Sequence, residues 1–248
     1  MDDGARCPEE SLAMARKAVE DGIHTIVATP HTLNGIYVNP VKEVTSRVAA
    51  LQEALSKKLI KLQLYAGADV HLCPRVLKRI ETGDAGTINN ARKYILLEFP
   101  PQTIPPGVKE EIFSLKLNGI TPIISHLERN AIIQHDLDVM YELVSSGALC
   151  QVTAMSITGD FGSMVMQCAE RLLKHRLVHV IASDAHSADR RPPVLSQAVE
   201  VATQILGSFE DAERMVTDVP ASILSGDVPE IPEPLPAKRG HGFRERRS

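Results

Sequence analysis

Metal-binding residues follow several short apolar runs of the sequence. They are His31, Asp69, Glu98, His126, Asp184 and His186. Each apolar run predicts a buried strand, and in α/β barrels the loops at the carboxyl ends of the strands form the active face. The side chains are therefore expected to converge at one mouth, where imidazoles and carboxylates together suit zinc, manganese or iron.

Taken singly, these residues have ordinary explanations. His31 alone is more often a loop or capping histidine, Glu98 a paired carboxylate, and Asp69 a cap of the next element. Asp184 and His186 form a stronger pair, because alternate positions of a strand point to the same side and can hold one ion. The coincidence of so many ligand types at strand ends is what favours a metal site.

Glu128 and Arg129 stand between His126 and the next predicted helix. A guanidinium beside a metal cluster can hold phosphate oxygens bidentately, so we expect Arg129 to anchor a phosphate. The alternative is a surface arginine paired with Glu128 or Asp136. Glu128 is a candidate for moving protons in catalysis, and Arg191, after the last strand, is a second candidate for substrate binding.

Short apolar runs alternate with amphipathic stretches along the chain. This alternation predicts strand–helix units around a parallel sheet or barrel, and strands that are apolar almost throughout predict burial on both faces. The strands are expected at 25–28, 62–66, 94–98, 120–125, 148–153 and 178–183. The helices are expected from Pro8 to a stop at Gly22, from 41 to 55, and near 108–118, 136–146, 162–175 and 194–206.

Bulk properties narrow the function classes. The 248 residues suffice for one α/β domain, placed at 1–227, and the net charge of -4 comes without a large block of one sign, which argues against nucleic acid as the main partner. Apolar runs are far shorter than the roughly 20 residues that span a bilayer. The cysteines lack metal-site spacing and read as reduced thiols of a cytoplasmic protein. Residues 228–248, with several prolines and a basic end, predict a disordered tail.

An ordered set of segments points to one known family. The segments are Asp2-Asp3-Gly4-Ala5, Ile26-Val27-Ala28-Thr29-Pro30-His31, the Asn34-Gly35 and Tyr37 loop, Leu97-Glu98-Phe99-Pro100, Ser125-His126-Leu127-Glu128-Arg129, Gln151-Val152-Thr153-Ala154 and Ile181-Ala182-Ser183-Asp184-Ala185-His186. They closely resemble the bacterial manganese-dependent protein-tyrosine phosphatases of the polymerase and histidinol phosphatase (PHP) superfamily, which are associated with capsule and exopolysaccharide synthesis. The resemblance covers most of residues 1–225.

The resemblance implies a fold, a cofactor and a substrate. The fold is a distorted TIM-like (β/α)7 barrel, and the cofactor is a cluster of two or three divalent ions, manganese first, with iron or zinc as alternatives. The implied metal ligands are His31, Glu98, His126, Asp184 and His186, and the implied phosphate-binding arginine is Arg129. The implied substrate is phosphotyrosine on the tail of a partner bacterial tyrosine kinase.

The sequence departs from the family pattern at two internal positions. At Asp69 the family usually has a glutamate that bridges two metals, and aspartate is one methylene shorter, so the bridge is expected to be weaker or adjusted by the backbone. Leu127 replaces a usual proline, with little expected effect.

A larger departure lies at the start. The family opens with a strand carrying a His-x-His pair shortly before the segment that matches residues 2–5, whereas this sequence begins at Met1. We expect the first barrel strand and two ligands to be missing from these residues, which leaves strand edges exposed. Either the coding start lies upstream, or the chain is truncated and impaired.

These observations predict metal-dependent hydrolysis of phosphotyrosine on a protein. Metal-activated water is expected to attack phosphorus in line while Arg129 neutralises the equatorial oxygens. One alternative is a PHP-type phosphoesterase acting on a small molecule such as histidinol phosphate. The other is a truncated, non-catalytic relative that docks a kinase. An oligomer is compatible with the sequence.

Overall fold

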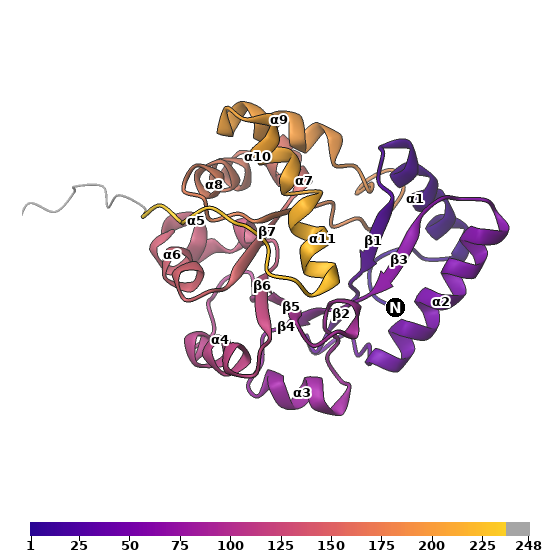
Figure 1. The fold of residues 1–248 in the computed structure, drawn as a ribbon, viewed down its shortest axis with the longest axis horizontal. Helices are drawn as coiled ribbons and strands as arrows, with labels where there is room; N and C mark the ends of the chain where they lie inside the picture. Colours follow the sequence, from indigo (N-terminus) through magenta and orange to yellow (C-terminus); the bar gives the residue numbers. More distant parts are fainter. Residues whose placement is uncertain (237–248) are drawn as a thin grey trace, which may run out of the picture.

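A curled sheet of parallel strands forms the centre of the computed structural model, which describes residues 1–236 (Figure 1). The strands are β1 Thr25–Ala28, β2 His31–Thr32, β3 Gln63–Ala66, β4 Asp69–His71, β5 Tyr94–Glu98, β6 Thr121–Ile124, β7 Leu149–Thr153 and β8 Val180–Ala182. Their order is β2-β4-β5-β6-β7-β8, with β1 paired to β3. Every pair is parallel, and the sheet curls into a half barrel.

Two of the predicted strands, β1 and β3, are followed directly by the short strands β2 and β4 toward the carboxyl end of the sheet. The Gly67 amide donates to the Ala28 carbonyl at 2.9 Å and the Asp69 amide to the Pro30 carbonyl at 3.1 Å, so the β1–β3 ladder continues into β2–β4. A Cβ at Gly67 would lie 2.9 Å from Val27 Cγ1, so the close approach of these strands requires glycine. Both chain segments thereby extend to the carboxyl end of the sheet.

The helices lie mainly on the outside of the sheet (Figure 1). They are α1 Pro8–Glu20, α2 Val41–Lys57, α3 Val76–Thr82, α4 Val108–Leu117, α5 Ala131–His135, α6 Asp138–Ser145, α7 Ala154–Thr158, α8 Ser163–Lys174, α9 Ser196–Leu206, α10 Phe209–Arg214 and α11 Asp218–Ser225, with 3-10 turns η1 Ile88–Asn90 and η2 Leu127–Arg129. Each strand and helix predicted from the sequence occurs near its expected place, with β8 shorter than expected. The short elements β2, β4, α3, α5, α7, α10 and α11 were not predicted, because they span too few residues to show a period.

The interior of the half barrel is filled by apolar side chains. The cluster contains Ile88, Tyr94, Leu96, Ile123, Leu149, Val180, Val219 and Ile223. Val219 and Ile223 come from α11, which therefore packs against the inner face of the sheet. A larger core lies between the sheet and the outer helices, so β5 through β7 are covered on both faces as predicted.

The side of the half barrel between β1 and β8 is open. Within residues 1–236, β1 pairs only with β3 and β8 only with β7. A cavity of about 1030 Å³ lies between them and is lined by both strands. The side chains of β1 are exposed or half-buried, contrary to the prediction of burial on both faces, because one edge of the strand faces this cavity.

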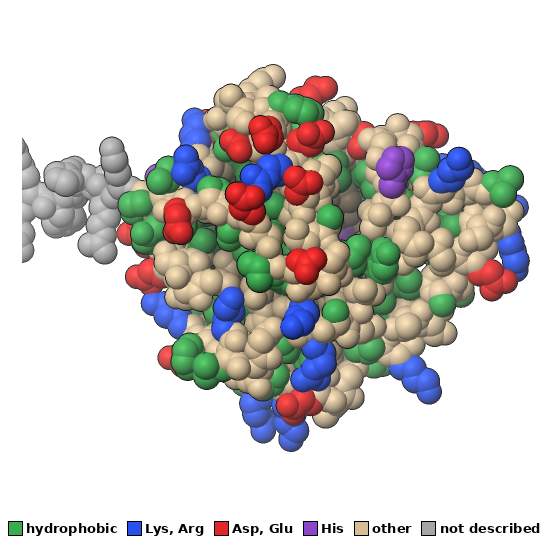
Figure 2. Space-filling view, in the orientation of Figure 1, with side chains coloured by type: hydrophobic (Ala, Val, Ile, Leu, Met, Phe, Trp, Pro, Cys, Tyr) green, Lys and Arg blue, Asp and Glu red, His purple; other side chains and the backbone are tan. Residues whose placement is uncertain are grey.

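The chain after α11 lacks helix and strand as far as residue 236. The Leu235 amide donates to the His175 carbonyl at 2.8 Å, which fixes part of this segment. The rest of the predicted tail lies outside the described residues. No helix within 1–236 combines the length and apolarity needed to cross a bilayer. On the face in Figure 2, acidic side chains gather over α9 and α10 and basic ones over α3 and α4, without one dominant patch.

Candidate active site

Strand register brings the predicted ligands together at the carboxyl end of the sheet. His31 on β2 is the register partner of Asp69 on β4, and His71 is the partner of Glu98 on β5. His126 follows β6 with a left-handed backbone, φ 32° and ψ 41°. Such a conformation is uncommon for a residue with a side chain and is typical of functional positions.

Two carboxylates lie between two histidines. Asp69 Oδ2 is 3.5 Å from His31 Nδ1 and 3.2 Å from His126 Nε2. Glu98 Oε2 is 3.4 Å from His31 Nδ1, and its Oε1 is 3.6 Å from His126 Nε2. The hydroxyl of Ser125 donates to Asp69 Oδ1 at 2.9 Å. The site thus unites His31, Asp69, Glu98 and His126.

The electrostatics of this cluster favour a cation. The adjacent Glu98 carboxylate, with Asp69, raises the pKa of His31 to about 9. Burial disfavours the charged form of His126, but the hydrogen bond and the charge of Asp69, together with the charge of Asp184, raise its pKa above the usual value. Burial likewise opposes ionisation of Glu98, yet His31 and His126 bring the pKa of that carboxyl below its usual range. The Glu98 carboxyl is thus held in its ionised form, and a carboxylate facing two imidazoles attracts a proton or a metal ion.

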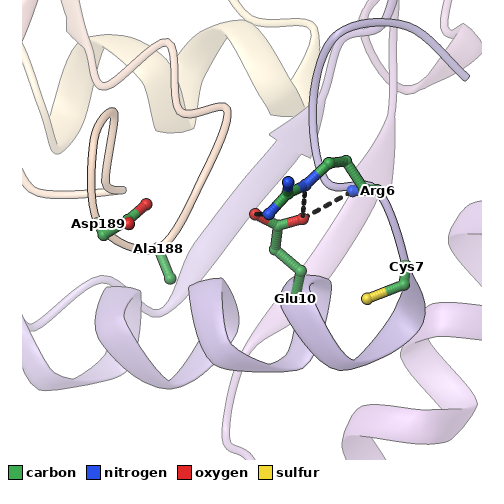
Figure 3. Close-up of a pocket in the computed structure, with 5 residues that line it drawn as sticks. All are labelled: Arg6, Cys7, Glu10, Ala188 and Asp189. Atoms are coloured by element: carbon green, nitrogen blue, oxygen red, sulfur yellow. Dashed lines mark hydrogen bonds and ion pairs between the residues drawn. The ribbon is translucent and has the colours of Figure 1, made fainter.

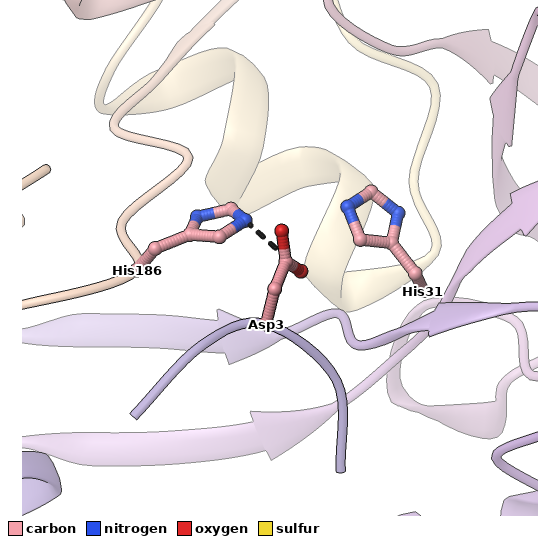
Figure 4. Close-up of side chains that lie close together, drawn as sticks. All are labelled: Asp3, His31 and His186. Atoms are coloured by element: carbon pink, nitrogen blue, oxygen red, sulfur yellow. Dashed lines mark ion pairs between the residues drawn. The ribbon is translucent and has the colours of Figure 1, made fainter. Parts of the chain in front are cut away.

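The donor set fits a divalent metal ion. His31 Nδ1 is buried and has no hydrogen-bond partner among the described residues, although two carboxylates face it. One ligand atom each from His31, Asp69 and Glu98 lies within 4.8 Å of the others, and the same holds for Asp3, His31 and His186. Figure 4 shows the Asp3 carboxylate between the two imidazoles, with Oδ1 3.5 Å from His186 Nε2. His31 therefore belongs to both groups, which suits a site for more than one ion.

Backbone contacts hold His31 in place. Its amide donates to Asp2 Oδ2 at 2.9 Å, and its carbonyl accepts from Asn39 Nδ2 at 2.7 Å. Asn39 is buried and its own amide donates to the Thr32 hydroxyl at 3.0 Å. Asp2 and Asn39 thus orient a candidate ligand through its backbone.

Beside the histidine cluster lies a pair of arginines. Arg129 Nη2 donates to Asp184 Oδ2 at 2.7 Å and to the Thr153 hydroxyl at 2.8 Å. Arg191 Nη2 donates to the same Asp184 oxygen and to the Asp184 carbonyl. Burial opposes ionisation of Asp184, but the two guanidiniums lower the pKa of its carboxyl. The Nε atoms of both arginines are buried without hydrogen-bond partners among the described residues.

The prediction that Asp184 and His186 occupy alternate positions of a strand is wrong. β8 ends at Ala182, and both residues lie in the loop that follows, with Asp184 at φ 50°. His186 Nδ1 lies 2.8 Å from the Asp184 carbonyl. Asp184 Oδ2 faces the arginines, whereas His186 Nε2 faces Asp3, so the loop directs the two side chains to different neighbours.

Glu128 is fully buried, and Arg129 is half-buried rather than the surface arginine of the alternative. Its Oε1 accepts from the Thr153 amide at 3.1 Å and from the Ser156 hydroxyl at 2.5 Å. It also lies 3.8 Å from Arg129 Nε. The side chain therefore contacts the end of β7 and the start of α7, beneath the arginine rather than at the mouth.

Asp3 and His71 were missed by the sequence analysis. His71 Nδ1 lies 3.8 Å from Glu98 Oε2. Its spacing of two residues from Asp69 within one strand was a signal, because alternate strand positions share a face. Asp3 carried no such signal, because it precedes α1 and reaches the site only through the tertiary fold.

Other candidate groups do not join this cluster. Cys150 and Cys168 are buried, as predicted, and burial raises the pKa of both thiols, to about 12 for Cys168, so neither is a thiolate nucleophile. A shallow hollow beside α1 is lined by Arg6, Cys7, Glu10, Ala188 and Asp189 (Figure 3). There Arg6 is already paired with Glu10, with Nε 3.1 Å from Oε2.

Comparison with known proteins assigns the family. Residues 1–225 match the family described as "Capsular polysaccharide synthesis, CpsB/CapC". The chain belongs to the CpsB/CapC family.

The chain resembles several members of the CpsB/CapC family along most of its length. It is 36% identical over 197 residues to the putative tyrosine-protein phosphatase CapC of Staphylococcus aureus, covering 79% of this chain and 77% of that protein. It is 34% identical over 239 residues to the tyrosine-protein phosphatase YwqE of Bacillus subtilis, covering 96% and 93%. Tyrosine-protein phosphatase CpsB of Streptococcus pneumoniae is 28% identical over 229 residues, covering 90% and 93%.

A solved structure has the same fold. It comes from the crystal structures of YwqE from Bacillus subtilis and CpsB from Streptococcus pneumoniae, which are described as unique metal-dependent tyrosine phosphatases. The TM-score is 0.91 at 33% identity, with 96% of each chain covered. The curled parallel sheet described above is therefore the fold of this family.

Proposed function

We propose that this chain is a metal-dependent protein-tyrosine phosphatase, and that its fold is the distorted (β/α)7 barrel of the PHP superfamily. The observation that carries the proposal is that a group of candidate metal ligands and a pair of arginines lie next to each other at the carboxyl end of the sheet. A histidine–carboxylate cluster lies on one side, and two arginines that converge on Asp184 lie on the other. Family membership supports the same conclusion, because the relatives are named tyrosine-protein phosphatases.

The ligand side of the site is formed by His31, Asp69, Glu98, His126, Asp184 and His186, with Asp3 as an added candidate. Divalent ions held there, manganese first and iron or zinc as alternatives, would supply an activated water and neutralise phosphate charge. Ser125, through its hydrogen bond to Asp69, keeps that carboxylate oriented toward the histidines.

Arg129 and Arg191 form the phosphate-binding side. Each guanidinium has a buried Nε without a hydrogen-bond partner within residues 1–236, and both share one oxygen of Asp184. A phosphate brought to this place would supply oxygens for these donors, in the bidentate manner that arginine favours. Arg129 would then stabilise the negative charge on the equatorial oxygens in the transition state.

Glu128 acts in this proposal as a positioning residue. Complete burial separates it from bulk water, and its contacts run to Thr153, Ser156 and Arg129. The Thr153 hydroxyl also accepts a hydrogen bond from Arg129, so the buried Glu128 carboxylate fixes the position of Thr153 and, through it, of the arginine. A proton-transfer role for Glu128 would need a path that this burial does not provide.

The proposed substrate is phosphotyrosine on a protein, with the tail of a bacterial tyrosine kinase that controls capsule or exopolysaccharide synthesis as the specific candidate. The relatives' names support a phosphoprotein substrate, and the family description supports capsule synthesis.

Hydrolysis of a phosphotyrosine peptide tests the proposed function. The full chain would be assayed with manganese, after chelation, and after reloading with zinc or iron, together with Glu98→Gln and the exposed control Glu53→Gln. We expect phosphate release that requires metal, loss of both metal content and release in Glu98→Gln, and retention of both in Glu53→Gln.

Other outcomes select the alternatives. Rapid hydrolysis of small alkyl phosphates without peptide hydrolysis would assign a small-molecule phosphoesterase. A chain that binds none of these metals and hydrolyses neither substrate would be the non-catalytic relative that docks a kinase. Peptide hydrolysis that persists after complete metal removal would contradict the metal-dependent mechanism.

A further inference from the structure

An aromatic ring lies against both arginines of the phosphate-binding side. Phe161 belongs to the loop between α7 and α8, and its ring centroid lies 4.3 Å from Arg129 Cζ and 5.6 Å from Arg191 Cζ. Both guanidiniums donate to the same oxygen of Asp184. The ring therefore borders the place where the two cations converge.

The loop presents this ring without burying it. Phe161 is half-buried, and it stands between Gly159 at φ 92° and Gly162 at φ 94°, two conformations that favour glycine. Contact with the guanidiniums is stabilised by the attraction of cations to the ring face. Because the ring is only partly covered, apolar aromatic surface remains available beside two anion-binding groups.

We propose that Phe161 is a specificity-determining residue that selects aryl phosphates over alkyl phosphates, an inference that rests on the proposed function. A phosphate held by Arg129 and Arg191 would carry its ester group within reach of the bordering ring. A phenyl group joined to that phosphate through one oxygen can approach the Phe161 ring to the separation at which aromatic pairs attract, about 4.5–7 Å between centroids. An alkyl ester offers no such ring.

A second role for Phe161 has to be distinguished from this one. The ring also contacts both guanidiniums, and a role confined to restraining them would weaken phosphate binding in general when the ring is removed. Recognition of the substrate ring predicts a loss confined to aryl ligands. Restraint of the arginines alone predicts an equal loss for every phosphate-like ligand, including one without an organic group.

Calorimetric binding separates these roles without requiring turnover. The manganese-loaded full chain, Phe161→Leu and Phe161→Tyr would be titrated with phenylphosphonate, methylphosphonate and inorganic phosphate. We expect the wild-type protein to prefer phenylphosphonate over methylphosphonate by about 5- to 10-fold. Phe161→Leu should lose that preference while its affinity for inorganic phosphate stays within about 2-fold, and Phe161→Tyr, which keeps the ring, should retain it.

Several outcomes would overturn the inference. Equal binding of the two phosphonates by the wild-type protein would contradict the inference. A Phe161→Leu protein that keeps the preference for phenylphosphonate would also contradict it. A parallel loss of inorganic phosphate binding in Phe161→Leu reduces the residue to a restraint on the arginines.

The proposed function fails in a different way. Preference for phenylphosphonate by a protein that hydrolyses no phosphotyrosine peptide would overturn the proposed function and leave the inference standing. Peptide hydrolysis by a protein without the preference would do the reverse, and a protein that shows neither the preference nor peptide hydrolysis would overturn both.

Discussion

The two ends of the parallel strands have opposite characters. Toward the amino ends, apolar side chains of the sheet pack against α11, and the buried His179 accepts a hydrogen bond from the Cys150 amide, although its Nε2 has no hydrogen-bond partner among the described residues. Toward the carboxyl ends, imidazoles, carboxylates and guanidiniums face one another, and several of their buried nitrogen atoms lack hydrogen-bond partners in the part of the chain that the structure describes. Packing at one end stabilises the fold, while unsatisfied polar groups at the other end are available to a ligand. Changes at the carboxyl ends should therefore alter activity, and changes at the amino ends should alter stability.

Removal of Arg129 should have the largest effect on activity. In Arg129→Ala the phosphate-binding side loses the donor shared by Asp184 and Thr153. We expect kcat/KM for a phosphotyrosine peptide to fall about 100- to 1,000-fold, as for loss of a donor that stabilises transition-state charge. Steady-state kinetics measure this, with Arg190→Ala, an exposed arginine of the same loop as Arg191, as the matched control. Similar losses in both variants would show that general positive charge, rather than this contact, matters.

Truncation of Leu149 should lower stability and leave activity unchanged. This β7 residue is buried in the cluster that includes α11, so Leu149→Ala leaves a cavity and should lower the free energy of unfolding by about 3 kcal/mol. Urea unfolding measures that loss, and the specific activity of the folded fraction should not change. Leu117→Ala, at an exposed position of α4, is the control and should be nearly neutral. A loss of specific activity in fully folded Leu149→Ala would show that the amino ends of the strands also affect activity.

The pH dependence of stability should report His179. Burial lowers the pKa of His179 to about 4, so the folded protein keeps it neutral while the unfolded chain binds a proton below about 6.5. Its stabilising contribution is therefore complete above pH 6.5 and is lost as the pH falls toward 4. We expect this one group to remove about 2 kcal/mol of unfolding free energy between pH 7 and pH 5.

Denaturant unfolding at both pH values, in the presence and absence of the substitution, isolates this contribution. His179→Gln should flatten the pH dependence, whereas His135→Gln, at an exposed position, should leave it unchanged. An unaltered slope in His179→Gln would show that His179 does not set the pH dependence of stability.

Loss of the Ser125 hydroxyl should have the smallest effect. Ser125→Ala removes the hydrogen bond to Asp69 Oδ1 but leaves every proposed ligand in place. Because outer-shell partners orient metal ligands, we expect manganese affinity to fall by about 10-fold with little change in unfolding. Metal titration monitored by activity and by calorimetry measures this, with Ser114→Ala on α4 as control. Unchanged affinity would show that the strand register alone orients Asp69.

The regular elements of the fold were largely predictable, and the open side was not. The strands at 25–28 and 94–98 have the predicted bounds, because apolar runs between turn signals mark strands directly. Burial differed between them, since β1 faces the cavity while β5 is covered on both sides. An apolar run shows that a strand can be buried, but only its neighbours determine whether it is.

The candidate site was predictable as a set of residues but not as a geometry. Strand ends identified Glu98 and His126, because parallel strands deliver such residues to one edge. The strand-based expectation failed for Asp184 and His186, because the sequence does not show where a three-residue strand gives way to a loop. The position of His71 was also predictable, because it lies two residues after Asp69 and alternate strand positions share a face.

The sequence by itself determined the alternation of strands and helices and the chemical types at the strand ends, because both depend on residues that are close along the chain. Only the tertiary structure decided that Asp3 lies between two histidines, that Asp184 accepts from two arginines, and that Phe161 borders those arginines. These contacts join segments far apart in sequence. Their geometry depends on how the sheet curls and on loops whose local patterns do not specify a partner.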